Sequence, residues 1–567
     1  MQAGIDRLGR FLERRRWYVV GAWLLLLLAA APFAARQTDH LTAGGFDVPG
    51  SGSEVVSRNL TRFERAQDQA LAVVLARRPG ATTAGVRSEI DRADRIAARL
   101  PHVGLSASAA RAAKRQPGDA SVVVLPLRVN GSLDQTADLA VDLRDALGKG
   151  KTRPDHVEAH LVGQQALWAG MQDLSKKDLA SAESKGFPIV LLILLAVFGS
   201  LAAAALPLAL GFASVTLTGA AIYFLSQATD MSVFVTNVAS MIGIGVAVDY
   251  SLFVLARYRE EVRAGAEPVE ARRIALRTSG LAVAFSGLTV MISLAGLFLV
   301  DSTTIRSMAM GAIIVVAVSI LGAVTLLPAL MRLLGRRAYA RGRLAVIAAL
   351  VARNWRDRRR RPGSTHPDRP PRRDFWQRWT ERVTRRPVLA AVASAAVLLL
   401  LAIPALSLSF GDGALRQFPA GNETRVGAEL AAKRLGAGSE GPVQIVASFE
   451  RGSASSARNR RAARAYLRRL RRDPEVAAVA PPRTSRDGRA VLLQAQPRHD
   501  PESAQARALV ARLRDDHGAL ARSAGMKVGG ATAYVEDFKN LVAGSMWKIL
   551  VFVLAFSYLV LLVLLRS

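Results

Sequence analysis

Long apolar blocks alternate with polar stretches of very unequal length along this chain. Eight blocks reach the roughly 20 apolar residues that a membrane-spanning helix needs. They are Trp17–Ala35, Phe187–Ala205, Leu206–Ser226, Val233–Leu255, Ser279–Val300, Ile305–Leu334, Val388–Leu408 and Trp547–Leu565. The first block is too long for a signal peptide and lacks a cleavage site. The second and third blocks adjoin, which predicts a helical hairpin with a tight turn near Leu206–Pro207.

The order of the blocks predicts a polytopic α-helical membrane protein with two large polar domains. From the start of the chain, we expect an N-terminal segment (1–16), one helix (17–35), a polar domain (36–186), five helices (187–334), a basic linker (335–387), one helix (388–408), a second polar domain (409–546) and one helix (547–567).

The short loops predict the orientation, because arginine and lysine favour the cytoplasmic side of a membrane. Arginines gather before the first helix, at 7, 10 and 14–16, and in the loop after the fourth helix, between 257 and 277. The linker 335–387 holds 17 arginines against four acidic residues. The loops near Asp230 and Asp301 are poor in both basic types. We therefore expect a multi-pass protein of the plasma membrane, with a cytoplasmic N-terminus and both polar domains outside the cytoplasm.

Composition narrows the class of protein further. A length of 567 residues alone would suggest three or four soluble domains. Half of the residues are hydrophobic and the mean hydropathy is positive, at +0.21, which excludes a cytosolic enzyme, a disordered chain and a disulfide-stapled secreted module. The chain has no cysteine, which leaves its redox compartment open.

The net charge of +31 does not indicate a nucleic-acid partner. Only 10 of the 76 basic residues are lysines, a bias more typical of a GC-rich genome than of a DNA-binding surface. The basic linker could be an arm for nucleic acid or lipid headgroups, but an anchor at the inner leaflet explains it more simply. Its segment Arg358–Arg373 combines prolines with like charges and is expected to be unfolded.

Both polar domains alternate strand and helix patterns in the same order, strand–helix–strand–strand–helix–strand. This is the split βαβ order of a ferredoxin-like α+β fold. In the first domain we expect these elements at Ala70–Arg77, Ala84–Leu100, Val103–Ala107, Ala120–Val129, Leu133–Leu147 and Val157–Val162. In the second we expect them at Val443–Phe449, Ala457–Arg471, Val476–Ala480, Ala490–Gln496, Glu502–Asp516 and Met526–Val528.

The chain also repeats itself, which indicates a tandem duplication with both copies in the same orientation. Leu161–Gln164 and Lys527–Gly530 precede equivalent membrane helices at a shift of 366 positions. The first copy has six helices, whereas the second stops after two. We therefore expect a C-terminally truncated chain that lacks helices nine to twelve of a parent of about 700 residues.

The fourth helix carries the one carboxyl group inside a predicted span, Asp249, about eight residues from the basic boundary at Arg257. That spacing places it about 12 Å deep in an apolar layer of roughly 30 Å. Burial there costs about 2.5–3.5 kcal/mol and favours a functional role, such as a proton relay with the adjacent Tyr250. Gly243 and Gly245 would allow neighbouring helices to approach closely. The alternative is a structural carboxyl, and on either reading the hydrogen-bond partners that we expect on the fifth helix are Ser286, Thr289 and Ser293.

The residues around Asp249 resemble the MMPL (mycobacterial membrane protein large) family of transporters, in the RND superfamily. The resemblance rests on Gly243-x-Gly245-x-x-x-Asp249-Tyr250-x-x-Phe253, on Arg257–Glu261, on Gly44–Gly50 after the first helix, and on the duplicated layout. It implies export of lipids, lipid-like metabolites or hydrophobic drugs, driven by proton influx through two Asp-Tyr pairs, with two external porter domains. The second pair would fall at about residue 615, outside this sequence.

The resemblance leaves other readings open and adds no enzymatic chemistry. A non-transporting membrane scaffold or sensor and an inactive truncated paralogue remain alternatives, and the substrate and oligomeric state are undetermined. Gly150-Lys151-Thr152 ends like a phosphate-binding loop but lacks its first glycine. His156, Glu158 and His160 alternate on one strand face, where we expect solvated side chains and not a metal site. We expect no enzyme activity, no cofactor and no metal; the expected partners are the lipid bilayer, a hydrophobic substrate and protons.

Overall fold

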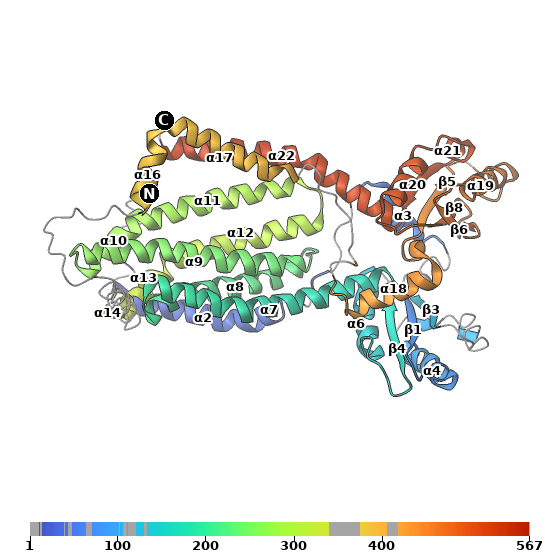
Figure 1. Cartoon of the computed structure of the whole chain (residues 1–567), viewed down its shortest axis with the longest axis horizontal. Coiled ribbons are helices and arrows are strands. Elements are labelled where there is room, and N and C mark those ends of the chain that lie inside the picture. Colours follow the sequence, from blue (N-terminus) through green and yellow to red (C-terminus); the bar gives the residue numbers. More distant parts are fainter. Residues whose placement is uncertain are drawn as a thin grey trace, which may run out of the picture.

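A computed structural model gives the arrangement of the chain (Figure 1). It describes residues 11, 14–38, 40–42, 48–63, 71–100, 103–105, 110–111, 121–129, 133–339, 375–404, 415, 418–450 and 452–565. The resemblance at 44–47 and the segment 358–373 expected to be unfolded therefore lie outside the described residues. Long helices run side by side at one end of the molecule, and two α+β domains stand next to each other at the other end (Figure 1).

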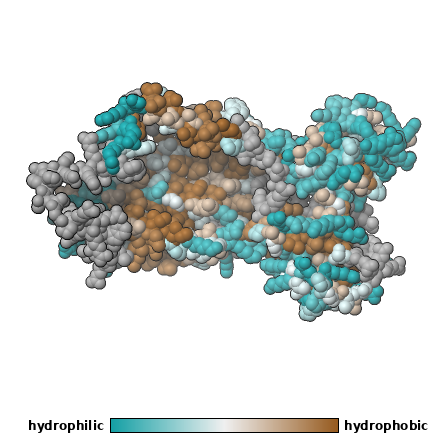
Figure 2. Space-filling view, in the orientation of Figure 1, coloured by the Kyte–Doolittle hydropathy of each residue, from teal (hydrophilic) through white to brown (hydrophobic). Residues whose placement is uncertain are grey.

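Seven helices or helix series in the described residues are long and apolar enough to cross a membrane, and an eighth is counted if the bent pair α16–α17 is one span. They are α2 (Arg16–Ala35), α7 (Gln164–Phe198), α8 (Leu201–Ser226), α9 (Phe234–Arg263), the series α10 (Pro268–Ala275), η2 (Leu276–Gly280), α11 (Leu281–Ala295) and η3 (Gly296–Leu299), the pair α12 (Thr303–Val324) and α13 (Leu326–Leu334), α16 (Phe375–Arg385) with α17 (Pro387–Ala402), and α22 (Ala531–Leu565). The surface over these helices is largely apolar, whereas that of the α+β domains is mostly hydrophilic (Figure 2).

The hairpin between the second and third spans turns earlier than the sequence suggested. Helix α7 ends at Phe198, Gly199 takes the left-handed conformation (φ 66°), and Ser200 precedes α8. Glycine adopts this conformation at helix ends without a steric penalty. The turn expected near Leu206–Pro207 is wrong: Pro207 lies inside α8, in its second turn.

The first α+β domain contains a four-stranded antiparallel sheet in the order β2-β3-β1-β4. Its elements are β1 (Ala72–Arg77), α4 (Thr83–Arg99), β2 (Val103–Leu105), β3 (Val122–Val129), α6 (Leu133–Leu147) and β4 (Val157–Val162). They follow the expected strand and helix order, and β4 and α6 have the expected bounds. Alternate residues of β1, such as Val73 and Leu75, pack under α4 and α6 in one apolar core.

The second α+β domain repeats this arrangement with the order β6-β8-β5-β9 and a short strand, β7, beside β8. Its elements are β5 (Val443–Ser448), α19 (Ala457–Leu470), β6 (Val476–Val479), β7 (Arg483–Thr484), β8 (Ala490–Pro497), α20 (Ala504–Arg514), α21 (Ala519–Ser523) and β9 (Gly525–Gly529). Ile445 of β5 and Leu509 of α20 belong to its core.

Two helices that the sequence did not predict exchange between the halves of the chain. Helix α18 (Glu423–Leu435) belongs to the second half but packs on the first sheet, where Ala431 meets Val74, Val122 and Val162. Helix α3 (Gly52–Leu60) belongs to the first half but packs on the second sheet. Each sheet is therefore covered on its second face by the other half, and the two domains form one interlocked unit.

Candidate functional site

Helix α9 carries the predicted site and packs between α8 and α12. A methyl group at Gly243 would lie 2.5 Å from Val315 of α12 and 3.2 Å from Val215 of α8. Gly243 therefore permits the close approach of three helices that the sequence suggested. Because neighbouring helices hold α9 along this face, its orientation about its own axis is fixed.

No described residue packs closely on Gly245. A methyl group there would meet nothing within 4 Å in the described structure. Two residues along a helix rotate the side chain by about 200°, so Gly245 and Gly243 point to nearly opposite sides.

Asp249 lies on the same uncovered side as Gly245. Met241, Gly245, Asp249 and Phe253 follow one another at intervals of four residues, and all four are exposed in the described structure. This spacing makes one continuous stripe along α9. Asp249 is also the one charged residue between Asp230 and Arg257. A carboxyl group at membrane depth requires water or a polar partner, so this stripe cannot simply face lipid.

Tyr250 points the other way, into the helix bundle. It is 7% exposed, and its side chain forms a hydrogen bond with Ser286 of α11. A methyl group at Gly287 of α11 would lie 3.1 Å from its hydroxyl oxygen, so this glycine makes room for the ring. The sequence-adjacent pair is therefore split: Asp249 faces the uncovered stripe and Tyr250 connects α9 to α11.

The three partners expected for Asp249 are placed differently from the prediction. Ser286 bonds to Tyr250, Thr289 donates to the carbonyl oxygen of Phe285 on its own helix at 3.0 Å, and Ser293 is half-buried further along α11. Within the described residues, none of the three forms a hydrogen bond with Asp249. The reason is rotational, because α11 packs on the Tyr250 side of α9.

A groove of about 600 Å³ opens beside Ser286 and Thr289. Arg277, Leu281 and Phe285 line it from η2 and α11, and Val560 of α22 closes its other side. It combines an apolar wall with the hydroxyl groups of Thr278, Ser286 and Thr289, which is the lining expected of a site for a largely apolar ligand.

Two of the three strand residues that were weighed above as metal ligands lie in a buried polar seam, by which we mean the contact between β4 and α18. His156 is exposed, but Glu158 and His160 are buried between β4 and α18, contrary to the solvated side chains that we expected. Glu158 pairs with Arg78 at 2.9 Å and accepts a hydrogen bond from Thr152, so Thr152 of the loop-like Gly150-Lys151-Thr152 motif supports this carboxylate. No group of three metal-binding side chains occurs in the described part of the chain.

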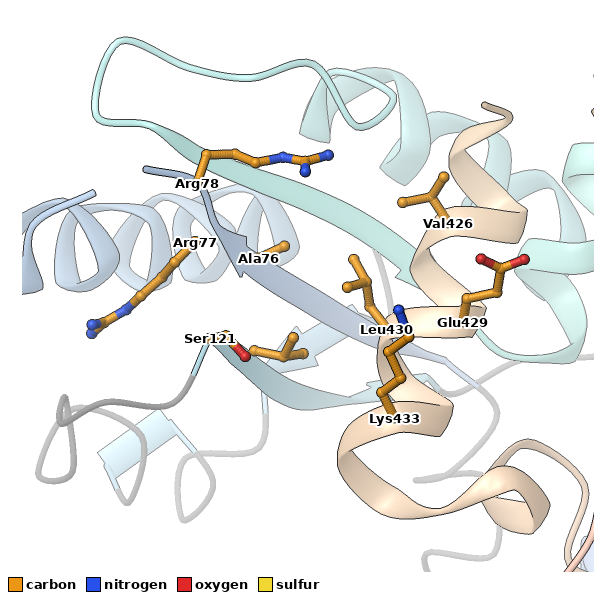
Figure 3. Close-up of a pocket in the computed structure, with 9 residues that line it drawn as sticks. Ala76, Arg77, Arg78, Ser121, Val426, Glu429, Leu430 and Lys433 are labelled. Carbon is orange, nitrogen blue, oxygen red and sulfur yellow. The ribbon is translucent and has the colours of Figure 1, made fainter. Parts of the chain in front are cut away.

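Charges in this seam shift the pKa of Glu158. Burial disfavours the charged carboxylate and acts to raise its pKa. The hydrogen bonds from Arg78 and Thr152, together with the positive charge of Arg78, outweigh burial and lower the pKa of Glu158. Figure 3 shows the cavity of about 260 Å³ next to this seam, with Val426 and Leu430 of α18 facing the strands. The cavity lies at the joint between the two halves of the chain.

A second buried ion pair fixes α18 to the first domain. The Nε of Arg144 donates to Glu423 at 2.9 Å, and the backbone amide of Leu161 donates to the other carboxylate oxygen at 3.0 Å. Both side chains are less than 10% exposed. The second domain holds α3 by related chemistry: Arg514 and Ser53 both donate to Asp537.

Comparisons with known proteins agree with this architecture. The sequence profile of the MMPL family matches residues 50–390 and 416–567. The chain is 41% identical, over 99% of its length and 57% of the relative's, to a protein of Mycobacterium tuberculosis named heme uptake protein MmpL11. It is 39% identical, over 99% of its length and 58% of the relative's, to the mycolic acid-containing lipids exporter MmpL11 of Mycolicibacterium smegmatis. The chain thus spans somewhat more than half the length of these relatives.

A solved structure has the same fold. The hedgehog release protein Disp of the water bear Hypsibius dujardini superimposes with a TM-score of 0.51 at 13% identity, over 98% of this chain and 83% of that one. The family profile covers most of the chain, with both halves and the helix that carries Asp249. The chain therefore belongs to the MMPL family.

Proposed function

We propose that this protein uses proton influx to export lipids or hydrophobic, lipid-like metabolites or drugs across the cytoplasmic membrane. The observation that carries the proposal is Asp249, the lone carboxyl in the middle of α9, held on an uncovered stripe by the packing of Gly243. An ionisable group at that depth is costly and marks ion or proton pathways in membrane proteins. Tyr250 forms a hydrogen bond with Ser286, so a movement of α9 would also affect α11.

The class of cargo follows from relatives and from the apolar surfaces of the fold. The relatives' names refer to mycolic acid-containing lipids and to heme, which are both large and mostly apolar molecules. The open groove along α11 has a largely apolar lining. We favour export of lipids over the competing proposal, which is uptake of an apolar macrocycle. The export experiment below distinguishes the two.

We assign the two α+β domains the role of external porter domains with a ferredoxin-like fold. Their strand orders, β2-β3-β1-β4 and β6-β8-β5-β9, support that assignment. In the proposed topology the N-terminus and the basic linker are cytoplasmic, as the arginine distribution favours. The exchanged helices α3 and α18 make each domain depend on the position of the other.

The proposed cycle begins with substrate entering the external domains from the outer leaflet or from the membrane–domain boundary. Protonation neutralises Asp249 and weakens its attraction to the polar groups that face the uncovered stripe. The helix bundle then rocks, and this movement changes the gap between the external domains. Release of the proton to the cytoplasm resets the bundle.

The test is an Asp249→Asn substitution at the native chromosomal position in the source organism. Newly made lipids are labelled with radioactive acetate, and the ratio of surface to cell-associated lipid is measured. We expect this ratio to fall by about tenfold or more for one lipid class, because asparagine cannot exchange a proton. Membrane levels of the protein should be unchanged.

The matched control is Asp230→Asn, which removes an exposed carboxyl group from the loop between α8 and α9. It should leave the ratio unchanged. A membrane scaffold or sensor would tolerate Asp249→Asn equally well, so an unchanged lipid ratio would overturn the export proposal. Accumulation of external heme that stops in the Asp249→Asn strain, with no lipid change, would reverse the proposed direction.

A further inference from the structure

Helix α7 belongs to two hydrophobic cores at once. It begins at Gln164, one residue after β4, and runs for 35 residues, about 52 Å, to Phe198. Near its start, Ala166 and Ala169 pack in the core of the first external domain. Near its end, Leu194 and Phe198 pack in the core of the membrane helices. A displacement of α7 in the membrane is therefore also a displacement inside the external domain.

Two polar contacts connect α7 to α9. At the external end, the side-chain amide of Asn237 donates to the hydroxyl of Ser175 at 2.5 Å. At the cytoplasmic end, the guanidinium of Arg259 donates to the carbonyl oxygen of Phe198 at 3.0 Å and lies 5.4 Å from the centre of the Phe198 ring. Arg259 is buried, so this contact lies inside the helix bundle and not at its surface.

The spacing of the two contacts keeps the helices in register. Ser175 and Phe198 are 23 residues apart on α7, about 34 Å, and Asn237 and Arg259 are 22 residues apart on α9, about 33 Å. The helices run in the same direction, and the contacts join them at matching heights. Asp249 lies between the contacts, 12 residues from one and 10 from the other.

The contacts of α9 with α8 and α12 are of a different kind from those with α7. Against α8 and α12 it packs through small and branched apolar side chains, such as Val215 and Val315 around Gly243. Packed apolar surfaces can slide past each other by small shear movements, whereas a hydrogen bond is lost when its geometry changes. A shift of α9 would therefore slide along α8 and α12 but carry α7 with it, and α11 through the bond between Tyr250 and Ser286.

We infer that Asn237 and Arg259 are positioning residues that transmit a proton-linked movement of α9 through α7 to the first external domain. This inference rests on the proposed function, in which Asp249 is the group that is protonated. Ser175 and Phe198 are the points on α7 that receive the movement.

The test measures a distance between the external domain and the membrane helices. Because the chain has no cysteine, Arg95→Cys on α4 and Ala228→Cys in the loop after α8 give two unique sites for spin labels. The full chain is reconstituted in lipid nanodiscs, and the distance is measured by electron paramagnetic resonance from about pH 8 to about pH 5. We expect the distance to shift, and Asp249→Asn to show the low-pH distance at both pH values.

The variants then separate coupling from folding. Arg259→Gln and Asn237→Ala should each lose at least half of the shift, and the exchange Ser175→Asn with Asn237→Ser, which swaps donor and acceptor, should restore it. The matched control is Arg257→Gln, because Arg257 pairs with Glu260 and Glu261 on its own helix and not with α7. It should shift like the unaltered protein.

Each result decides the inference. A full shift in both Arg259→Gln and Asn237→Ala would overturn it and leave the proposed function intact. A distance that is independent of pH in the unaltered chain would also overturn it, and the lipid ratio of the Asp249→Asn strain then decides the proposed function separately. Loss of the shift in the two variants, with restoration by the exchange, supports it.

Discussion

Helices α7 and α22 occupy equivalent places in the two halves of the molecule. Each is 35 residues long and follows the last strand of the sheet in its own half of the chain. Each is preceded by a glycine with positive φ, Gly163 at 116° and Gly530 at 98°, which turns the chain from strand to helix. Each also enters the core of its own domain, through Ala166 and Ala533 respectively.

The two helices differ in how they meet the other membrane helices. Helix α7 forms hydrogen bonds with α9 at Ser175, about a third of the way along it, and at its last residue, Phe198. Helix α22 meets α11 and η3 through apolar contacts, in which a methyl group at Gly296 would lie 3.0 Å from Phe552 and 3.5 Å from Val553. Within the described residues, the contacts of α22 with α11 and η3 can therefore slide, whereas those of α7 with α9 include directional bonds.

The largest expected effect concerns the ion pairs that attach the exchanged helices. Arg144→Met leaves the Glu423 carboxylate buried and unpaired, which should cost about 3–5 kcal/mol in the stability of the first domain. Arg514→Met disturbs a pair in which the arginine is partly exposed, 27%, and should cost about 1–3 kcal/mol in the second. Hydrogen exchange of the amides in β4 and β9, followed by mass spectrometry, reads each domain separately.

The double variant Arg144→Met with Glu423→Met is the control for the first domain. It should recover most of the lost protection, because two apolar side chains replace a buried pair without leaving an unpaired charge. Equal losses of stability in Arg144→Met and Arg514→Met would show that the more deeply buried ion pair does not stabilise its domain more than the other.

Acid should open the first domain at the seam between β4 and α18. The pKa of Glu158 is lowered in the folded protein, so its contribution to stability is present above the carboxyl's ordinary pKa and lost as the pH falls below it, from about 4 downward. The measurement is hydrogen exchange of β4 as a function of pH. Glu158→Gln should remove this pH dependence, and a β4 response that is identical in the variant would assign it to another group.

The smallest expected effect compares two glycines on α9. Gly243→Ala places a methyl group 2.5 Å from Val315 and should cost about 1–3 kcal/mol of stability through overpacking. Gly245→Ala meets nothing within 4 Å and should be neutral or stabilising by up to about 1 kcal/mol, because alanine favours helix. Thermal unfolding in detergent measures both, and a reversed order would contradict the described packing of α9.

Local patterns were sufficient to predict most elements. The predicted strand and helix order of both α+β domains is confirmed, and the bounds of α6 and β4 agree to the residue. The prediction of a hairpin turn near Leu206–Pro207 is wrong, although Gly199-Ser200 combines a helix-ending glycine with a residue that favours helix starts. That signal was present in the sequence.

Contacts between distant segments could not be predicted in this way. Glu158 and His160 read as solvated strand residues, since nothing near them in the sequence shows that α18, more than 250 residues later, covers them. The same applies to Asp249, whose expected partner Ser286 bonds to Tyr250 instead. Residue spacing predicts on which face of a helix or strand a side chain lies, but it does not predict which other element packs on that face.

The central claim, that Asp249 gains and loses a proton, can be measured directly by infrared spectroscopy of the protein reconstituted in lipid. With isotope-labelled aspartate, we predict one protonated-carboxyl band whose intensity changes between acidic and neutral buffer, because the proposed cycle requires this carboxyl to exchange a proton. The band should be absent in Asp249→Asn and unchanged in Asp230→Asn. The same band in Asp249→Asn, or no titrating band in the unaltered protein across that range, would contradict the claim.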